Sequence, residues 1–385
     1  MKEGWTYKKL GEVCEVISGQ SPDGKSYNNE GKGTPFYQGK KEFTIKYIGN
    51  PTTWTSEETK IAMKDDILMS VRAPVGDINF ATQRVCIGRG LAAIRPNTLI
   101  DKDYLFYFLL SEKNNIKGKE GAVFPSINRK EIMDISISYP IFSEQQRIVS
   151  RLDSAFAHID ERKANAEKQL SEARALFQQA LTKAMEPKEG WEEKKLEDLC
   201  TDIVDCPHST PRKVDHPTKY PCIRTSELKG GKIEWESMQY LDEDEYIVRT
   251  ARIKPQPNDI VYGREGTYGD AVLLPEGYYF SLGQRTMLFR PDVRCVEPKY
   301  LHYNVISSHV YEQAKAKNSG CGVGHVNVKD IKVFKIGVPP LSKQQRIVSR
   351  LDSLSAHVRE LEEVLQKTIS ECDALKQALL RQVFE

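Results

Sequence analysis

Two stretches of the chain carry mostly apolar positions spaced alternately three and four residues apart, the spacing of a coiled-coil seam. The first seam runs through Val149, Leu152, Phe156, Ile159, Lys163, Ala166, Leu170, Ala173, Phe177 and Ala180. The second runs through Ile347, Leu351, Leu354, Val358, Leu361, Leu365, Thr368, Cys372, Leu375 and Leu379. The pattern predicts two long helices, over residues 143–186 and 342–385, each roughly 60 Å long at 1.5 Å per residue.

Both helices begin with the same local signal. Ser143 stands three residues before Gln146, and Ser342 stands three before Gln345, which are capping-box patterns. Two arrangements would bury the seams: each helix packs on its own globular domain, or the two helices pack on each other in antiparallel fashion. Two seams of equal length favour the second arrangement.

The chain repeats itself. The segment SEQQRIVSRLDS at Ser143 returns as SKQQRIVSRLDS at Ser342, with one difference, Glu144 against Lys343. KEGWTYKKLGEVC returns as KEGWEEKKLEDLC, and DILMSVRAPVGD returns as DIVYGREGTYGD. The chain is therefore two copies of one unit. We expect four segments, listed in chain order: a globular domain over 1–142, a spacer helix over 143–186, a second globular domain over 187–341 and a second spacer helix over 342–385.

The globular segments read as mixed helix and strand. Short apolar runs such as DILMSV, DIVYG, DISISYP and KVFKIGVPP are typical of strands. KDYLFYFLLSE and PKYLHYNVISS are typical of short helices with an apolar face. Because strands and long helices do not alternate regularly, a doubly wound sheet is not expected. The prediction is an α+β fold with two domains in tandem, joined by two long antiparallel coiled-coil helices.

Composition narrows the class of protein. Charged residues make up 29% of the chain and the formal net charge is only +2, so nucleic-acid binding is neither required nor excluded. We see no apolar run of the roughly 18–20 residues that a membrane span needs and no signal-peptide core, so we expect a cytoplasmic protein without a membrane partner.

The eight cysteines include no Cys-x-x-Cys pair, which indicates reduced thiols. Cys200, Cys206, His208, His216 and Cys222 contain the residue types that zinc prefers, but their spacing matches no usual zinc site. We favour ordinary loop residues and assign no metal site.

Two long loops, over residues 18–43 and 205–232, mix cationic, amide, hydroxyl and aromatic side chains. This mixture suits double-stranded DNA, because Lys and Arg meet phosphates while Asn, Gln and Arg pair with base edges. A solvated loop with tight turns is the alternative. The loops occupy equivalent places in the two copies yet differ in sequence, as the reading of two different DNA sequences would require.

The candidate DNA contacts come from these loops and from turns that follow or precede the strands. In the first copy they are Gln20, Ser21, Tyr27, Asn28, Tyr37, Gln38, Lys40, Arg72 and Arg89. In the second they are His208, Ser209, Thr210, Arg212, Lys213, Arg224, Arg264, Gln284 and Arg285. We place Arg72 and Arg264 at matching positions of the two copies.

The sequence yields no catalytic residue. It lacks the Asn/Asp-Pro-Pro-Tyr/Phe tetrapeptide of adenine methyltransferases and the glycine-rich ATP loop. Pro22 and Asp23, followed by Glu30 and Lys32, match the Pro-Asp…Glu-x-Lys pattern of magnesium-dependent nucleases. They lie in a loop that the second copy does not repeat. A stand-alone nuclease or methyltransferase and a coiled-coil adaptor that binds only protein remain as alternatives.

The two FSEQQRIVSRLD and LSKQQRIVSRLD helices, with GQSPDGKSYNNEGKGTPFYQG and DCPHSTP, resemble the specificity subunits of type I restriction–modification systems. The resemblance implies that each globular unit reads one half of a split DNA target and that the helices set the spacing. It implies two methyltransferase subunits with S-adenosylmethionine, two motor–nuclease subunits with ATP and Mg²⁺, and no cofactor in this chain.

The repeated helix segments would then provide two like docking places for the partner subunits. We expect the docking residues to be Gln145, Gln146, Arg147, Arg151, Gln344, Gln345, Arg346 and Arg350.

Overall fold

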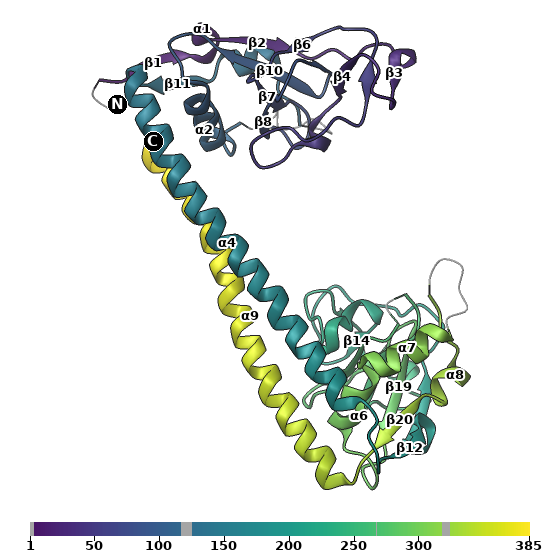
Figure 1. Cartoon of the computed structure of the whole chain (residues 1–385). Helices are drawn as coiled ribbons and strands as arrows, with labels where there is room; N and C mark the ends of the chain where they lie inside the picture. The colour runs from purple at the N-terminus through teal and green to yellow at the C-terminus, as the bar shows by residue number, and fades with distance from the viewer. Residues whose placement is uncertain (1–3, 117–124, 267, 318–323) are drawn as a thin grey trace. The chain divides into compact units, whose positions relative to one another are not determined.

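The computed structural model describes residues 4–116, 125–266, 268–317 and 324–385 (Figure 1). The chain divides into two compact units. Unit 1 comprises Met1–Glu167 and Gln366–Glu385, and unit 2 comprises Lys168–Leu365. Two long helices, α4 (Phe142–Met185) and α9 (Leu341–Phe384), contribute to both units.

Unit 1 is built on three sheets. An antiparallel sheet has the order β2 (Cys14–Ser18), β10 (Leu91–Pro96), β7 (Ile67–Ser70), β8 (Ile78–Phe80). β1 (Thr6–Lys9) pairs with β11 (Ser136–Tyr139). The third sheet follows the order β3 (Tyr27–Asn28), β5 (Trp54–Thr55), β4 (Thr34–Tyr37), β9 (Val85–Ile87), β6 (Ile61–Ala62), and β4 and β9 are parallel.

Unit 2 repeats this plan. Its antiparallel sheet has the order β13 (Cys200–Asp205), β19 (Thr286–Pro291), β16 (Ile260–Gly263), β17 (Ala271–Leu273). β12 (Glu192–Lys195) pairs with β20 (Lys335–Val338). The third sheet has the order β15 (Gln239–Tyr240), β14 (Pro221–Ile223), β18 (Ser281–Leu282), and β14 and β18 are parallel, as β4 and β9 are. The duplication inferred from the sequence is thus a duplication of topology.

Short helices cover these sheets. In unit 1 they are α1 (Leu10–Val13), α2 (Lys102–Glu112), α3 (Arg129–Met133) and the 3-10 turns Gly24–Ser26 and Lys40–Glu42. In unit 2 they are α5 (Glu243–Arg249), α6 (Pro298–Val305), α7 (Ser308–Ala316), α8 (Val328–Lys332) and the 3-10 turns Leu196–Leu199, Thr225–Glu227 and Lys229–Gly231. The predicted strands and helices are confirmed, except that α6 ends before Ser308, where α7 begins.

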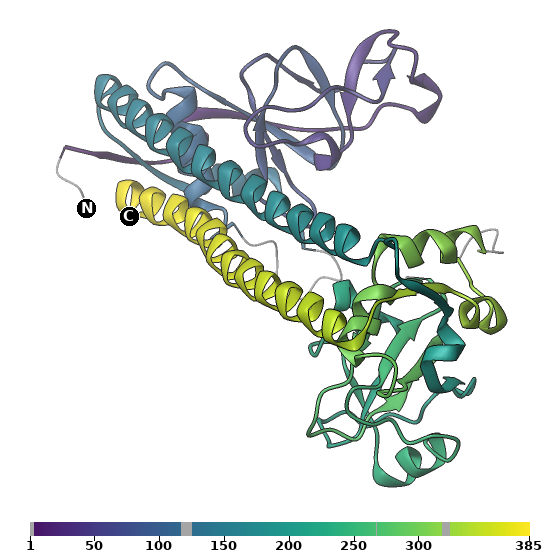
Figure 2. The ribbon, with the colours of Figure 1, turned by 60° about the horizontal axis from the view of Figure 1, so that its bottom comes forward.

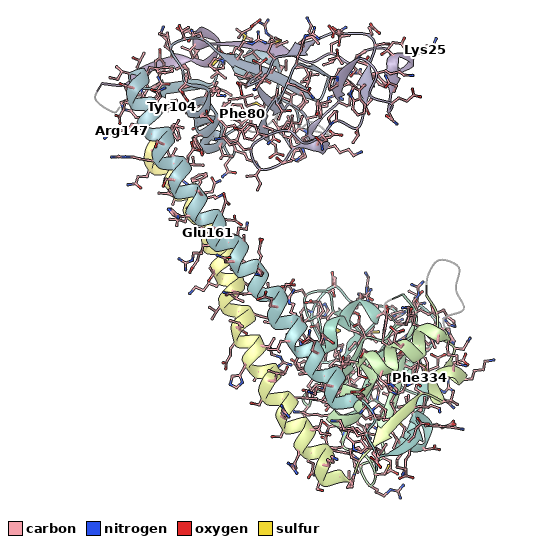
Figure 3. The ribbon with its side chains drawn as sticks, viewed as in Figure 1. Lys25, Phe80, Tyr104, Arg147, Glu161 and Phe334 are labelled. Carbon is pink, nitrogen blue, oxygen red and sulfur yellow. The ribbon has the colours of Figure 1, made fainter. Side chains whose placement is uncertain are left out.

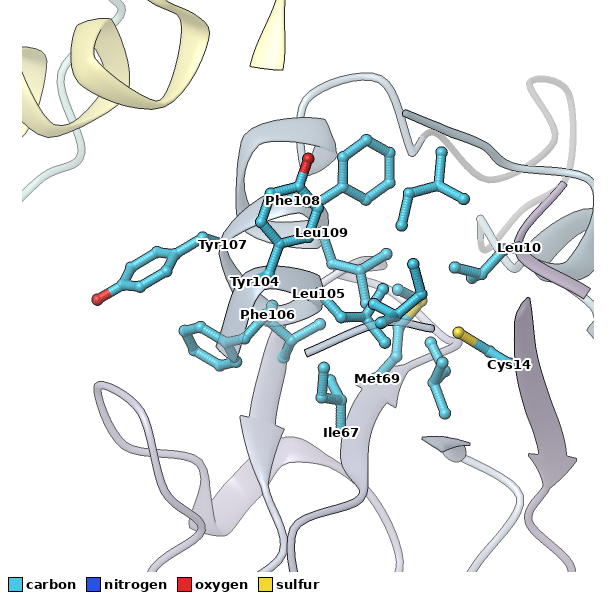
Figure 4. Close-up of a cluster of buried hydrophobic side chains, with 14 of the residues drawn as sticks. Leu10, Cys14, Ile67, Met69, Tyr104, Leu105, Phe106, Tyr107, Phe108 and Leu109 are labelled. Carbon is cyan, nitrogen blue, oxygen red and sulfur yellow. The ribbon is translucent and has the colours of Figure 1, made fainter. Parts of the chain in front are cut away.

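The core of unit 1 forms where α2 meets the first sheet. The side chains from Tyr104 to Leu109 are all buried and belong to one core cluster with Leu10, Cys14, Ile67 and Met69, although Tyr107 points away from these four residues (Figure 4). Unit 2 has a matching core in which Tyr300 and Leu301 of α6 pack with Ile260 and Phe289. Both units therefore bury a helix against an antiparallel sheet, and the predicted α+β class is confirmed.

The two long helices run antiparallel within each unit, side by side in both views (Figures 1 and 2). In unit 1, Lys163 Nζ lies 2.7 Å from Asp373 Oδ1, and Asp160 pairs with Lys376 at 2.5 Å. In unit 2, Arg174 Nε lies 2.8 Å from Glu362 Oε1. All ten predicted seam positions of α4 are buried or half-buried, but Leu361 and Leu375 of α9 are exposed.

The helix ends also complete the domain cores. Leu152 and Phe156 near the start of α4 share the core of unit 1 with Leu380 and Phe384 at the end of α9. In the same way, Val348 and Leu351 share the core of unit 2 with Leu181 and Met185. Both predicted arrangements therefore hold at once: the helices pack on each other and on globular sheets.

The helices begin one residue earlier than predicted, at Phe142 and Leu341. The Ile141 carbonyl accepts hydrogen bonds from the N–H groups of Glu144 and Gln145, at 3.0 and 3.1 Å. Ser143 therefore lies inside the first turn, which differs from the predicted capping box. Among the described residues, no helix is both long enough and apolar enough to cross a membrane.

The packing of Phe384 gives a test of the shared core. Its ring meets Tyr104 at 5.3 Å and Phe108 at 5.8 Å between centroids. Phe384→Ala should destabilise unit 1 by about 3–5 kcal/mol, because the substitution loses the free energy of burying the ring and leaves a cavity in its place. Hydrogen exchange should therefore speed up in α2 more than in α6. Leu375→Ala on the same helix removes an exposed side chain and should change stability by only about 0.5 kcal/mol. Equal effects in α2 and α6 would contradict this account.

Candidate nucleic-acid interface

In each unit several of the candidate residues gather on turns at one end of the antiparallel sheet. In unit 1, the Gln20 N–H donates to the Ile87 carbonyl at 2.9 Å, and the Val71 N–H donates to the Gly90 carbonyl at 3.0 Å. These bonds bring together three turns that are far apart in the sequence, carrying Gln20, Arg72 and Arg89. All three of these side chains are exposed.

Ser21 connects two of the exposed candidates of unit 1. Its hydroxyl donates to Gln38 Oε1 at 2.9 Å and accepts from the Arg89 N–H at 3.3 Å. Tyr27 stacks on Phe36 with 4.8 Å between ring centroids, and its hydroxyl donates to the Pro22 carbonyl at 3.0 Å. Burial raises the pKa of Tyr27. The result is an ordered surface on which Gln20, Gln38 and Arg89 project polar groups.

Two other candidates of unit 1 are held by local bonds. Lys40 pairs with Asp77, which also meets Lys113 Nζ at 2.6 Å. Burial alone would raise the pKa of Asp77, but hydrogen bonds from Lys113 and Lys40 hold it below its usual range. The Asn28 amide donates to the Lys32 carbonyl at 2.8 Å, and its oxygen accepts two backbone N–H groups, so this side chain shapes its own turn.

Tyr37 does not lie on this surface. Its side chain is 1% exposed, and its hydroxyl donates to the Gly49 carbonyl at 2.8 Å. Burial raises the pKa of this phenol to about 12. The expected base contact by Tyr37 is therefore corrected to a structural role. Tyr37 is the last residue of β4, and DNA cannot reach its buried ring.

In unit 2, Glu265 is the centre of the equivalent surface. Its carboxylate lies 3.1 Å from Arg264 Nη1, 3.3 Å from Arg285 Nε and 3.2 Å from His325 Nδ1. Arg264 also meets Asp205 at 3.0 Å, and His208 Nε2 lies 3.4 Å from the same carboxylate. The network joins turns that are distant in the sequence. Arg264 is 6% exposed and paired on both sides, so it positions its neighbours and its expected DNA contact is corrected.

Further candidates flank this network. Gln284 Nε2 lies 3.3 Å from both the His208 carbonyl and Thr210 Oγ1. The buried Arg249 donates to the Ser209 carbonyl at 3.2 Å and to the Leu282 carbonyl at 2.8 Å, which fixes the 205–212 loop. Sequence reasoning missed Arg249, Glu265 and His325, because only tertiary contacts bring them to this surface.

The other three candidates of unit 2 sit among acidic side chains or at the edge. Arg224 Nη2 donates to the buried Glu227 carboxylate at 2.6 Å. Arg212 faces Asp242 at 3.6 Å and Glu245 at 4.0 Å. Lys213 is exposed beside Val214, which bridges to the edge strand β15.

Backbone bonds correct the matching of the two copies. Arg264 N–H donates to the Arg285 carbonyl at 3.0 Å, as Val71 N–H does to Gly90. Arg72 bridges to Ser126, whereas Glu265 bridges to His325. Arg264 therefore corresponds to Val71, and Glu265 corresponds to Arg72. The expected match of Arg72 with Arg264 is off by one residue.

The residues considered for zinc lie in different surroundings. Cys206 and Cys222 are buried in separate core clusters, and burial raises the pKa of both thiols. His216 is exposed beside Asp215. Within residues 4–116, 125–266, 268–317 and 324–385, no group of three or more His, Cys, Asp or Glu side chains is placed to hold a metal ion.

The docking candidates divide into buried and exposed residues. Gln145 is buried: its Oε1 accepts from the Asp101 N–H at 2.8 Å, and its Nε2 donates to the Leu99 and Pro140 carbonyls, both at 2.9 Å. Gln344 makes the same three bonds, to Glu297, Cys295 and Pro339. We correct the expected docking role of both glutamines, because they join each helix to its sheet domain.

The remaining docking candidates are exposed on α4 and α9. They are Gln146, Arg147, Arg151, Gln345, Arg346 and Arg350. Figure 3 shows Arg147 on the outer side of α4.

Both copies of the repeated unit are similar to known proteins. A family model described as the type I restriction modification DNA specificity domain matches residues 2–171 and again 188–371. The chain is 24% identical to the EcoDI type I restriction enzyme specificity subunit of Escherichia coli, over 99% of the chain and 88% of that protein. It is 42% identical to a Methanocaldococcus jannaschii protein assigned as the MjaX specificity subunit, but this match covers 45% of the chain and 41% of the relative.

Solved structures show the same fold. A chain from a study of complex assembly and conformational transition in a type I R-M system matches 100% of this chain and 98% of its own length, with a TM-score of 0.78 and 19% identity. The HsdS subunit from Thermoanaerobacter tengcongensis matches 100% of this chain and 97% of its own length, with a TM-score of 0.55 and 19% identity. Both likenesses concern the fold alone.

The buried glutamines provide a prediction with a matched control. Gln145→Ala removes the partner of one N–H and two carbonyls and should cost about 1–3 kcal/mol. The neighbouring Gln146→Ala removes an exposed amide and should leave stability nearly unchanged. Thermal melting and hydrogen exchange at residues 99–101 would measure both. If the two variants behave alike, Gln145 does not hold the helix to its domain.

Proposed function

Because the chain belongs to the family of type I restriction modification DNA specificity proteins, we propose that its two units each read one half of a split DNA target. The proposal keeps the four segments expected from the sequence: reading domains over 1–142 and 187–341, and spacer helices over 143–186 and 342–385. The helices would set the distance between the half-sites and hold the partner subunits.

One observation carries the proposal: matched backbone positions of the two units carry different residues, most of them of types that can pair with base edges. Gly88 N–H donates to the Tyr37 carbonyl at 2.8 Å, and Gly283 N–H donates to the Ile223 carbonyl at 2.7 Å, which aligns the residues that follow. The matched pairs are Gln38 with Arg224, Arg89 with Gln284, Gly90 with Arg285, and Arg72 with Glu265.

These exchanges have a direct meaning in DNA recognition. Arg pairs with guanine, Gln pairs with adenine, and Glu accepts from the cytosine amino group. One framework with exchanged side chains at the same places suits two readers of unlike sequence. A protein-only adaptor would have no need of this pattern.

The repeated helices support the docking part of the proposal. We define face 1 as Gln146, Arg147, Ser150, Arg151, Ser154, Ala157, His158 and Glu161, and face 2 as Gln345, Arg346, Ser349, Arg350, Ser353, Ala356, His357 and Glu360. Every residue of both faces is exposed, and the two faces are identical in sequence. The buried Phe156 and Ile159 correspond to Ser355 and Val358, so these two inner positions differ, although the buried Leu152 and Leu351 are identical.

Identity at the exposed positions is more than folding alone requires, since substitutions at exposed positions change stability little. Two identical exposed faces suit two copies of one partner. We assign that role to two methyltransferase subunits carrying S-adenosylmethionine, joined by two motor–nuclease subunits that use ATP and Mg²⁺. This chain would hold no cofactor, would catalyse no step and would act in the cytoplasm, where its DNA and cofactors are.

The proposal is tested by expressing the chain with its methyltransferase partner and mapping N6-methyladenine across the host genome. A split motif with a fixed spacer is expected, and replacing residues 187–341 with those of a relative should change one half only. A continuous motif would contradict two readers. A stable complex without methylation would favour the adaptor, and methylation by this chain alone would favour an enzyme.

Arg285 gives a sharper prediction. Arg285→Ala should relax discrimination at one half-site by about 1–3 kcal/mol and leave the other half unchanged. Arg294→Ala is the control, because Arg294 is an exposed arginine beyond the opposite end of β19. Binding of the assembled complex to duplexes altered in either half measures both variants. Uniform weakening on all duplexes would instead mark Arg285 as a phosphate contact.

A further inference from the structure

The two docking faces are identical, but their immediate neighbours are not. Residue 144 is glutamate before face 1, and the corresponding residue 343 is lysine before face 2. Both residues lie in the first turn of their helix, three positions before the first arginine of the face. This spacing places them on the same side of the helix as that arginine.

In unit 1 the glutamate engages the arginine. Arg147 Nε and Nη2 each donate to the Glu144 carboxylate at 2.7 Å, so the guanidinium fork is already filled by a bidentate pair. The Arg147 guanidinium holds the pKa of Glu144 below its usual range, which keeps the carboxylate charged. A partner that brings its own carboxylate to Arg147 must first break this pair.

In unit 2 the arginine stands in different surroundings. Lys343 Nζ lies over the Trp191 ring, 5.5 Å from its centroid, and adds a second positive charge at this end of the helix. Within the described part of the chain, Arg346 makes no ion pair. Arg346 and Arg350 line a shallow hollow on α9, together with Ser349, Ser353, Leu354 and His357.

The charge balance of the two sites differs accordingly. Glu144, Arg147, Arg151 and Glu161 carry two positive and two negative charges, a net charge of zero. The corresponding Lys343, Arg346, Arg350 and Glu360 carry three positive charges and one negative, a net charge of +2. The difference bears on any charged partner, because charge at an interface acts on both encounter and bound state.

We propose that the two faces bind identical partner subunits with unequal affinity and that face 2 is occupied first, by an acidic patch of the partner that pairs with Arg346 and Arg350. This inference rests on the proposed docking function. At limiting partner concentration, the complex then accumulates with one partner on face 2, and the second partner joins on face 1 only after Arg147 exchanges Glu144 for the partner's carboxylate.

The experiment titrates the full chain with the methyltransferase subunit and follows the one-partner and two-partner complexes by native mass spectrometry. The two stepwise dissociation constants should differ by about tenfold beyond the statistical ratio for equal sites, and added salt should weaken the first step more. Hydrogen exchange on the one-partner complex should show protection at residues 346–357 before residues 147–158.

Two single-residue exchanges test the cause. Glu144→Lys should strengthen the weaker step and bring the two constants together, and Lys343→Glu should weaken the stronger step by about tenfold. Glu172→Lys and Lys367→Glu make the same charge changes at exposed helix positions outside both faces. These controls should leave the ratio of the two constants unchanged.

The possible outcomes distinguish unequal docking from the proposed docking function itself. Two equal binding steps in the unaltered chain, or initial protection on face 1, would overturn the unequal docking while leaving the docking function intact. Failure of the methyltransferase subunit to bind at all would overturn the docking function itself. Equal shifts from the controls and the test variants would show that net charge, not the charge beside each face, sets the affinities.

Discussion

Each globular unit depends on a helix end that arrives from a distant part of the sequence. Leu380 and Phe384 belong to the buried core of unit 1, although residues 168–365 separate them from the rest of that unit. Leu181 and Met185 complete unit 2 in the same way. Because apolar burial is the main favourable term in folding, unit 1 cannot complete its core until the last residues of the chain have been made. The long helices are thus structural parts of both domains.

This constraint explains which contacts are repeated. Gln145 and Gln344 make the same three hydrogen bonds, and Tyr107 and Tyr303 each donate to an aspartate on a long helix, Asp153 of α4 and Asp352 of α9. At the sheets, Arg95 pairs with Asp66 and Arg290 pairs with Asp259, both at 2.8 Å. Such buried or half-buried polar contacts are costly to break singly. The two copies therefore keep them, while the turns at the sheet ends share equivalent backbone hydrogen bonds and carry different side chains.

The predictable part of the fold is the part governed by local pattern. The helix over 102–112 and the two long helices follow from apolar spacing, which depends on neighbours within a few turns. Tyr37 and Gln145 could not be placed in this way. Tyr37 is enclosed because β4 pairs with β9 and its hydroxyl reaches Gly49, and Gln145 turns inward because the Leu99 carbonyl lies there. The wrong match of Arg72 with Arg264 has the same origin. The two residues are both arginine, but the backbone pairing aligns Arg72 with Glu265, one residue further along the chain.

The comparison of the two copies also separates two kinds of constraint on one helix. Leu152 and Leu351 are identical and buried, so folding accounts for them. Ala157, His158 and Glu161 are exposed and still return unchanged in the second helix, whereas the intervening buried Ile159 is replaced by Val358. Folding gives no reason for this, because exposed substitutions change stability little. The proposed docking of a partner subunit on face 1 and face 2 would account for this identity, and Glu144 against Lys343 is a charge difference directly beside the two faces.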